Sequence, residues 1–401
     1  MFYIRSIVMG ALFCFSLASH AQNTDVSFNE KAQKSLVEHY NRYKDKEYFS
    51  GGALSIYIPG EDIKNYYVGR TAHDDQTGRD ITANTLFQIG SITKSFTAAI
   101  ILQLEKEKKL SIDDTLEKWL PQYSKWPQIS IKSLLNMTSC LPNYSDTPLW
   151  NVDEFHQPLR RWKSEELVSY VYPKGELSPP LRQGYFYTNT GYILASMIVE
   201  KITEHSFTQE LNERTINKAG LENTFYPVPA TEIAIQSRLA HGYNYNQYDS
   251  PNFVGQNLQN NNLSWAAAAG GAVSNTEDII KWVKALFTEH VILDEAQQTK
   301  LKQIVSEQTG KPVKETTSTD PRAFGLGVAQ GFDKHMGRYW YYEGETLGYR
   351  AIYLYTPCNG VIISAVFNSA VDAKNDHIGE LMKQVFNLVQ ENYPKLKCKP
   401  V

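Results

Sequence analysis

The stretch "FQIGSITKSFTAAIILQL", residues 87–104, passes from a strand-like lead-in to an apolar helical run. Phe96, Ile100 and Leu104 recur at helical spacing, which predicts an amphipathic helix with one buried face. Ser91 and Lys94 stand three positions apart at its start, so their side chains share a face. The stretch therefore predicts either a serine nucleophile with a lysine base, or a helix-capping serine followed by a solvated lysine.

The segments on either side of this helix differ in their predicted secondary structure. Strand-like segments precede it at 51–60 and 64–70, and helical segments with polar loops fill most of 111–264. An amphipathic helix near residues 378–388 ends the chain. Before it come four β-rich segments separated by short turns, which predict an antiparallel meander: "AFGLGVAQGF" (323–332), "RYWYYEG" (338–344), "YRAIYLYTP" (349–357) and "GVIISAVFNSA" (360–370).

This order of elements predicts an α/β (α+β) fold, with one antiparallel sheet built from both termini, flanked by helices, and an inserted mostly helical lobe. We expect a single catalytic domain over 22–401, with a sheet lobe at 22–110 and 265–401 and the helical lobe at 111–264. The Asn-, Gln- and Tyr-rich segment 242–262 contains enough aromatic residues to predict an ordered rim or cover loop.

The first 21 residues have the pattern of a secretory signal peptide. Arg5 precedes a short apolar stretch at 7–18, and small residues at Ser19 and Ala21 predict cleavage after Ala21. The alternative is a buried or amphipathic N-terminal helix. We expect an exported protein, periplasmic or secreted, without a stable membrane anchor. The net charge of −3, with no basic run, argues against a nucleic-acid partner.

Several chemistries are excluded by missing motifs. The chain has no G-x-S-x-G, no H-E-x-x-H, no phosphate loop ending in G-K-[ST] and no paired-histidine spacing, so we expect neither metal nor cofactor. After the leader three cysteines remain without C-x-x-C spacing. A disulfide between Cys358 and Cys398 is possible in an oxidising compartment, and Cys140 is expected to be a small buried residue.

A second fragment, "YTNTGYILASMIVEKIT" (187–203), places Tyr187 and Asn189 just before another amphipathic helix. A phenol that shares a proton needs a cationic neighbour to lower its pKa, and a lysine would serve. Asn189 is able to donate its amide to a substrate carbonyl. The alternative is a turn asparagine preceded by a packed tyrosine.

Together these fragments resemble the serine-reactive penicillin-binding-protein superfamily, which includes class C β-lactamases, D-alanyl-D-alanine carboxypeptidases and related esterases. Similar blocks follow in order: "SIKSLLNMTSCLPNY" (130–144), with Cys140 in place of a glycine, "GGAVSNTEDIIKW" (270–282) and "NGVIISAVFNSA" (359–370). The resemblance implies a β-lactamase/transpeptidase-like fold, with Ser91 as the acylated nucleophile. It also implies that Lys94 and Tyr187 shuttle protons, and that Asn189 orients Lys94 and the substrate.

The third motif of this superfamily is Lys or His, Thr or Ser, then Gly, six residues before a Gly-aromatic pair. Counting back from Gly348-Tyr349 implies Tyr342-Glu343-Gly344 as its counterpart, since His335-Met336-Gly337 lies seven residues too early. The backbone N–H groups of Ser91 and Glu345 would then form the oxyanion hole.

This third motif departs from the pattern because it holds no cation. Tyr342 is able to donate a hydrogen bond, and the charge of Glu343 would oppose a substrate carboxylate if it faced the site. Arg350 either restores a cation to the substrate site or is an exposed strand residue.

We therefore expect an exported serine hydrolase acting through a Ser91 acyl-enzyme on D-alanyl peptides or β-lactams, that is, on small or peptidoglycan-derived substrates. An esterase or amidase for uncharged acyl substrates is the alternative, and it fits Tyr-Glu-Gly better. A second alternative is a sensor or binder that β-lactams acylate without turnover.

Overall fold

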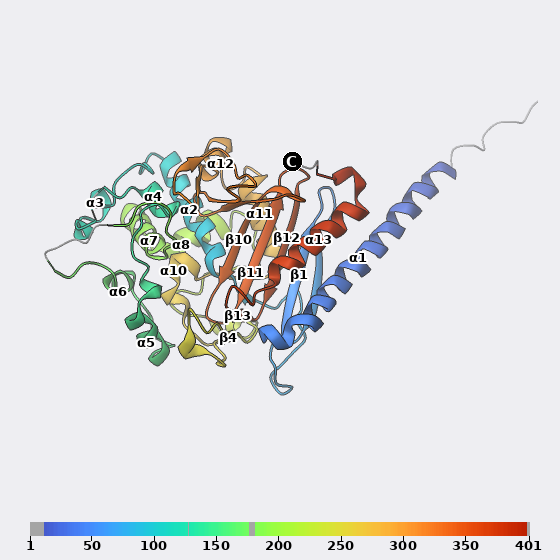
Figure 1. The fold of residues 1–401 in the computed structure, drawn as a ribbon, viewed down its shortest axis with the longest axis horizontal. Coiled ribbons are helices and arrows are strands. Elements are labelled where there is room, and N and C mark those ends of the chain that lie inside the picture. Colours follow the sequence, from blue (N-terminus) through green and yellow to red (C-terminus); the bar gives the residue numbers. More distant parts are fainter. Residues whose placement is uncertain (1–11, 127, 176–180, 399–401) are drawn as a thin grey trace, which may run out of the picture.

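The computed structural model describes residues 12–126, 128–175 and 181–398, and its centre is a nine-stranded antiparallel sheet (Figure 1). The strand order is β2-β1-β12-β11-β10-β9-β8-β6-β7. The N-terminal hairpin β1–β2 therefore joins the sheet through β1, which pairs with β12, the last strand of the C-terminal meander. The predicted antiparallel sheet built from both termini is confirmed. Its strands are β1 Gly51–Tyr57, β2 Lys64–Gly69, β6 Ile304–Ser306, β7 Pro312–Val313, β8 Arg322–Phe324, β9 Ala329–Asp333, β10 Gly337–Glu345, β11 Arg350–Thr356 and β12 Val361–Phe367.

Strand β12, at the centre of the sheet, is buried along its whole length because both faces of the sheet are covered there. In β12, Ile363 and Phe367 pack with helices α1 (Leu12–Glu47) and α13 (Ile378–Asn392). Alternate residues Ile362 and Val366 belong to the larger core on the other face, where α11 (Thr276–Phe287) lies against β12 and β1. Figure 1 shows α1 and α13 together on one side of the sheet. The two-residue alternation thus divides the strands between two cores.

The segment between β2 and β6 is mostly helical and is organised around α2, which contacts α7, α8, α10 and α12. Two small pairs of strands accompany it, β3 with β5 and β4 with β13. The remaining elements are β3 Phe87–Gln88, α2 Thr93–Lys106, α3 Leu116–Trp119, α4 Ile131–Leu135, α5 Pro148–His156, α6 Ser164–Ser169, α7 Thr190–Thr203, α8 Phe207–Leu211, α9 Ile233–Gln236, β4 Tyr243–Tyr245, α10 Ala267–Gly270, β5 Val273–Ser274, α12 Glu295–Leu301 and β13 Ser369–Val371.

The segment "AFGLGVAQGF" forms two strands, β8 and β9, so the single strand predicted there is wrong. The turn between them packs directly on α2. Gly327 has a φ of +74°, and a Cβ at this position would lie 2.7 Å from the Lys94 carbonyl oxygen and 3.0 Å from the Ala98 Cβ. Only glycine fits both the left-handed backbone and this close approach.

The predicted leader lies only partly within the described residues. Residues 1–11 lie outside them and residues 12–21 begin α1, so cleavage of the leader stays a prediction. Within the described ranges no helix is both long and apolar enough to cross a bilayer.

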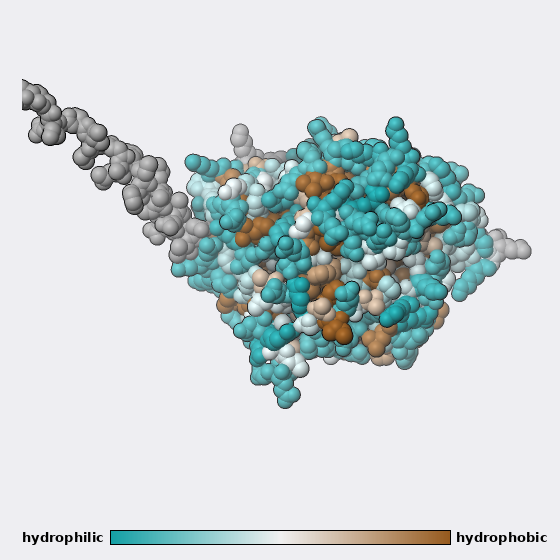
Figure 2. Space-filling model, turned by 180° about the vertical axis from the view of Figure 1, so that it is seen from behind, coloured by the Kyte–Doolittle hydropathy of each residue, from teal (hydrophilic) through white to brown (hydrophobic). Residues whose placement is uncertain are grey.

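Cys358 and Cys398 form a disulfide with a Cα–Cα distance of 5.5 Å, which ties the β11–β12 turn to the segment after α13. Figure 2 shows a mostly hydrophilic face with separate, small apolar patches.

Candidate active site

Ser91 and Lys94 are brought together at the start of α2. Ser91 lies in a 3₁₀ turn, Gly90–Ile92, that runs directly into the helix. The Lys94 Nζ is 2.9 Å from the Ser91 Oγ. Ser91 is partly exposed, whereas Lys94 is completely buried. The alternative of a solvated surface lysine is therefore wrong.

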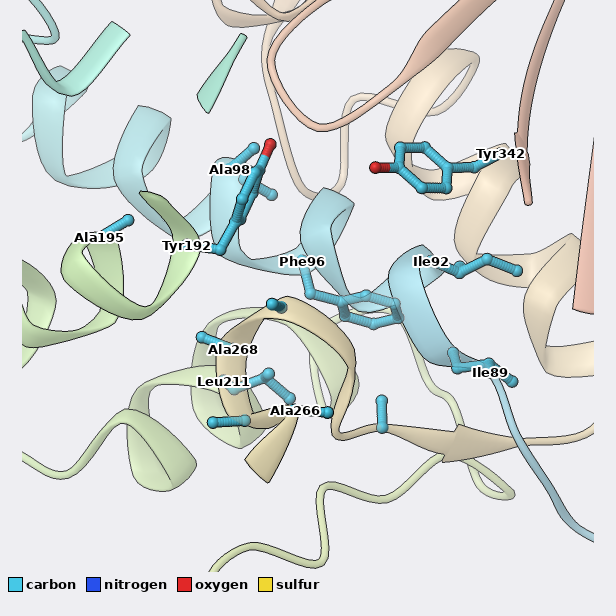
Figure 3. Close-up of a cluster of buried hydrophobic side chains, with 14 of the residues drawn as sticks. Ile89, Ile92, Phe96, Ala98, Tyr192, Ala195, Leu211, Ala266, Ala268 and Tyr342 are labelled. Carbon is cyan, nitrogen blue, oxygen red and sulfur yellow. The ribbon is translucent and has the colours of Figure 1, made fainter. Parts of the chain in front are cut away.

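The burial of Lys94 depends on the small residues of α10. Ala268 and Ala269 let this short helix lie against α2, so that Ala269 offers its carbonyl oxygen to the Lys94 Nζ at 2.7 Å. Figure 3 shows the alanines of this segment packed beside Phe96 of α2. Burial lowers the pKa of the Lys94 ammonium well below 10.5, because the charged form loses its hydration.

The three hydrogen-bond partners of the Lys94 Nζ indicate from which group the neutral amine accepts a proton. The Asn189 Oδ1, at 2.8 Å, and the Ala269 carbonyl oxygen are both acceptors. In the neutral amine the two N–H groups satisfy these acceptors, so the lone pair is left for the third partner, the Ser91 Oγ. Lys94 is thus arranged to accept the Ser91 proton.

Tyr187 approaches Ser91 from the other side of the hydroxyl, just before α7. Its OH is 2.6 Å from the Ser91 Oγ. Although the Tyr187 side chain is 36% exposed, the protein groups packed around its hydroxyl desolvate it and raise its pKa to about 12, while the hydroxyls of Ser91 and Tyr342 act in the opposite direction. The expectation that Lys94 lowers this pKa is wrong, even though its Nζ lies 4.9 Å from the ring centroid. Tyr187 therefore keeps its proton at neutral pH and is able to donate it.

Asn189 is held by two residues that sequence reasoning missed, Asn143 and Ser145. The Asn189 Nδ2 donates to the Ser145 Oγ at 3.0 Å, and its backbone N–H donates to the Asn143 Oδ1 at 2.9 Å. These contacts turn the Asn189 oxygen toward Lys94. The sequence signal for Asn143 and Ser145 was their position at the end of the 130–144 block and directly after it.

The C-terminal end of β10 lies directly against the turn that carries Ser91. A Cβ on Gly344 would overlap the Ile89 carbonyl oxygen and lie 3.1 Å from the Ser91 nitrogen. A Cβ on Gly90 would lie 2.6 Å from the Glu345 nitrogen. The two glycines thus place the backbone nitrogens of Ser91 and Glu345 on adjoining segments, which is the arrangement that the predicted oxyanion hole requires.

Tyr342, the predicted counterpart of the third motif's cation, supplies no charge. Its side chain is 4% exposed, and its hydroxyl lies close enough to that of Tyr187 to lower the pKa of Tyr187. Figure 3 shows its ring entering the apolar cluster opposite Tyr192, with the hydroxyl directed inward. The next residue, Glu343, is exposed and does not line the cavity over Ser91.

Arg350 does not supply the missing cation. It is 2% exposed, lies on the side of α1 and α13, and pairs with Glu47 at 2.8 Å and Asp376 at 2.6 Å. Its Nε also donates to the Ser369 carbonyl oxygen at 2.9 Å. The expected substrate contact and the alternative of an exposed strand residue are both wrong, because the partners that bury Arg350 lie far away in the sequence.

A cavity of about 940 Å³ opens over Ser91, Tyr187 and Asn189. The segment 242–262, predicted as an ordered rim, provides one wall through residues 246 and 248–252. The short 3₁₀ helix η3 (Tyr144–Asp146) and α5 provide another wall. Among the described residues, the charged ones that line the cavity are Asp146, Asp249 and Glu345, and none of the described Lys, Arg or His side chains lines it. Burial raises the pKa of Asp146 and raises that of Glu345 to about 7.

The structure places a serine at the floor of a cavity, hydrogen-bonded to a tyrosine and to a buried lysine. This arrangement, beside an antiparallel sheet, is that of a serine hydrolase. The chain belongs to the Beta-lactamase family, whose model matches residues 36–384. Penicillin-binding protein 4* of Bacillus subtilis (strain 168) is 26% identical over 272 residues, 66% of this chain and 58% of that protein. Teichoic acid D-alanine hydrolase of Staphylococcus aureus is 26% identical over 267 residues, 60% of this chain and 62% of that protein. The chain thus spans about three fifths of the length of these relatives, 58% and 62%.

Solved structures with the same fold include two enzymes named for amide hydrolysis. The D-amino acid amidase from Ochrobactrum anthropi SV3, complexed with L-phenylalanine amide, has a TM-score of 0.74 at 24% identity, covering 91% of this chain and 99% of that one. The D-stereospecific amidohydrolase from Streptomyces sp. has a TM-score of 0.70 at 22% identity, covering 90% and 97%. At these identities the likeness establishes the fold.

Proposed function

We propose that this protein is an exported serine hydrolase that forms an acyl-enzyme on Ser91 and acts on esters or amides not recognised through a carboxylate. The observation that carries the proposal is the hydrogen-bonded series Tyr187–Ser91–Lys94 at the floor of the cavity. Family membership and the hydrolase names of the relatives support it. Export rests on the leader pattern of residues 1–21 alone.

The acylation step follows from the protonation states of the two neighbours of Ser91. Neutral Lys94 takes the Ser91 proton as the Oγ bonds to the carbonyl carbon, and the developing oxyanion meets the backbone N–H groups of Ser91 and Glu345. The bond to the leaving group then breaks. Because Tyr187 is protonated at neutral pH, it gives the departing alkoxide or amine a proton and recovers one from Lys94. Water releases the acyl group by the reverse path.

The choice of substrate rests on the charges that face the cavity. D-alanyl peptides and β-lactams carry a carboxylate, for which the superfamily's third motif supplies a cation. Here Tyr342 is neutral, Arg350 is engaged elsewhere, and the charged groups among the described residues that line the cavity are all carboxylates. A substrate carboxylate would therefore be repelled. Hydrolysis of D-alanyl peptides or β-lactams remains the second candidate, favoured by the relative named Penicillin-binding protein 4*.

A substrate panel with the purified protein tests the proposal. It comprises p-nitrophenyl esters, an amino acid p-nitroanilide, nitrocefin and a D-Ala-D-Ala peptide, each run with wild type and Ser91→Ala. We expect turnover of the ester and anilide substrates that is lost in Ser91→Ala. Activity that survives in the alanine variant contradicts the mechanism. Stable labelling of Ser91 without product release would identify a binder instead.

A further inference from the structure

Glu154 is a buried carboxylate that the proposed mechanism does not use. It lies on α5, which provides one wall of the active-site cavity, and its side chain is 0% exposed. Its Oε2 accepts a hydrogen bond from the Trp162 Nε1 at 2.5 Å, and its Oε1 accepts one from the Asn261 Nδ2 at 2.7 Å. Both donors are neutral and lie on other segments, so Glu154 joins α5 to the chain around Trp162 and to segment 258–265.

From Asn261 the hydrogen bonds lead to the helix that holds Lys94. The Asn261 Oδ1 accepts from the Trp265 Nε1 at 2.7 Å, and α10 begins two residues after Trp265. The carbonyl oxygen of Ala269, on α10, is one of the two acceptors that engage the N–H groups of Lys94. Glu154 therefore fixes the start of the segment that carries this acceptor.

A second branch leads from Trp265 to the other acceptor of Lys94. The Trp265 carbonyl oxygen accepts a hydrogen bond from the hydroxyl of Tyr144, which is fully buried. The residues on either side of Tyr144 are the two that hold Asn189, whose Oδ1 is the second acceptor. Both acceptors of the buried amine are thus connected to Glu154 through Trp265.

The charge of Glu154 does not stabilise the fold. Burial raises the pKa of Glu154 from 4.5 to about 7, although the hydrogen bonds from Asn261 and Trp162 and the positive charge of Arg160 act in the opposite direction. The folded protein therefore holds this proton more tightly than the unfolded chain does. Its stability falls as the pH rises from about 4.5 to about 7 and Glu154 loses the proton. The effect of the ionised carboxylate has to be sought in the site that it supports.

The charged surroundings of Glu154 are sparse. Arg160, which also pairs with Glu166 at 3.4 Å, is the cation that acts on it. Segments 251–253 and 258–265, which contact α5, carry no ionisable side chain. The charge of Glu154 in turn contributes to the raised pKa of Tyr144, so its field reaches the second branch. The other ionisable side chains on η3, α5 and the segment that leads to α6 are Asp146, Asp153, His156, Arg161 and Lys163.

We propose that ionised Glu154 is a positioning residue for Lys94, because it holds in place the two segments that carry the acceptors of the amine. The inference rests on the function proposed above and adds a control of the same site by pH. When Glu154 takes up a proton, one of its oxygens becomes a donor, so Trp162 or Asn261 loses its acceptor. The two acceptors of Lys94 then shift, and its lone pair is no longer aimed at the Ser91 Oγ.

The test measures kcat/KM between about pH 5 and about pH 9 in wild type and in Glu154→Gln, on the best ester of the panel and per Ser91 labelled by a fluorophosphonate. Glutamine has the shape of the protonated acid and keeps one acceptor oxygen. Because Lys94 is present in both proteins, its own ionisation cancels in the ratio of wild type to variant. We expect this ratio to be near one at the acid end and to rise, with a midpoint at about 7, to about tenfold to a hundredfold.

Two further variants separate the charge from packing. Glu210→Gln is the matched control, because Glu210 is also a buried glutamate, 2% exposed, but it pairs with Arg214 and His205 on α8 and its neighbourhood. Its ratio should be near one at every pH. Asn261→Leu breaks the same connection from the other end and should give the same pH-dependent ratio as Glu154→Gln. The double variant should be no slower than the slower single variant, since both remove one connection.

The outcomes distinguish this inference from the proposed function. Ser91-dependent turnover with a ratio that is near one, or that does not change with pH, overturns the positioning role and leaves the hydrolase in place. Losses that add up in the double variant overturn it as well. If Glu154→Gln yields no protein that labels, Asn261→Leu provides the same comparison with wild type. If no ester or anilide shows Ser91-dependent turnover, the hydrolase proposal itself fails, and this inference fails with it.

Discussion

The contact between β10 and the nucleophile turn is tested most sharply by Gly344→Ala. A Cβ at this position would overlap the Ile89 carbonyl oxygen and lie 3.1 Å from the Ser91 nitrogen. Because non-bonded carbon and oxygen atoms need a separation of roughly 3.3 Å or more, the end of β10 must move away by roughly 1 to 1.5 Å. That shift lengthens the hydrogen bond from the Glu345 N–H to the oxyanion beyond a useful distance. Loss of one oxyanion donor costs about 10²–10³-fold in kcat, or about 2.7–4 kcal/mol of transition-state stabilisation.

The assay measures kcat on a p-nitrophenyl ester, per active site titrated by fluorophosphonate labelling of Ser91. We expect kcat to fall by about this factor while KM changes less, because the oxyanion forms only in the transition state. Gly379→Ala is the matched control: it lies in α13, and a Cβ there meets no atom within 4 Å. Its kcat should be that of wild type. A kcat for Gly344→Ala within about threefold of wild type would refute the assignment of residues 342–344 as the third motif.

Three further substitutions have defined outcomes. Lys94→Met should lower kcat about 10²–10⁴-fold. In wild type, kcat/KM should rise with pH as the buried amine loses its proton, with a midpoint below 10.5, and a pH–rate profile with its midpoint at 10.5 or above would contradict a desolvated base. Tyr342→Lys should raise the specificity ratio for carboxylate-bearing over neutral substrates in steady-state assays, whereas an unchanged ratio would mean that the motif is misplaced. Arg350→Met removes the guanidinium that pairs with Asp376 and leaves the buried Glu47 with His377 alone, so urea unfolding should show a loss of about 3–5 kcal/mol, and a fall in kcat per labelled Ser91 would contradict a purely structural role.

The elements that follow from local pattern were predictable. The helix through Phe96 and Ile100 is present as α2, and the β-rich segments after residue 337 are strands of the central sheet. Even the substitution in the 130–144 block keeps its backbone conformation: Cys140 has a φ of +52°, in the left-handed region that favours the family's glycine. Its buried thiol donates to the Gly184 carbonyl oxygen at 3.2 Å.

The errors share one cause, which is contact between distant parts of the chain. Segment 323–332 breaks into two strands because its Gly327 turn packs on α2, more than 200 residues earlier in the sequence. Tyr187 was expected to have a lowered pKa beside Lys94, but burial by surrounding elements dominates and raises it. Asn143 and Ser145 were missed because their partner, Asn189, is 46 and 44 residues away.

The sequence by itself was enough to propose the reacting groups of this protein. Ser91 and Lys94 are one helical turn apart, and Tyr187 and Asn189 stand at the start of another helix, so short-range spacing and the resemblance to a known family made them the candidates. The charge of the cavity was decided by the tertiary structure. Asp146, Asp249 and Glu345 come from three separate segments, and Arg350 is drawn to α1 and α13. Charges act through space, so which of them face the substrate depends on how those segments pack.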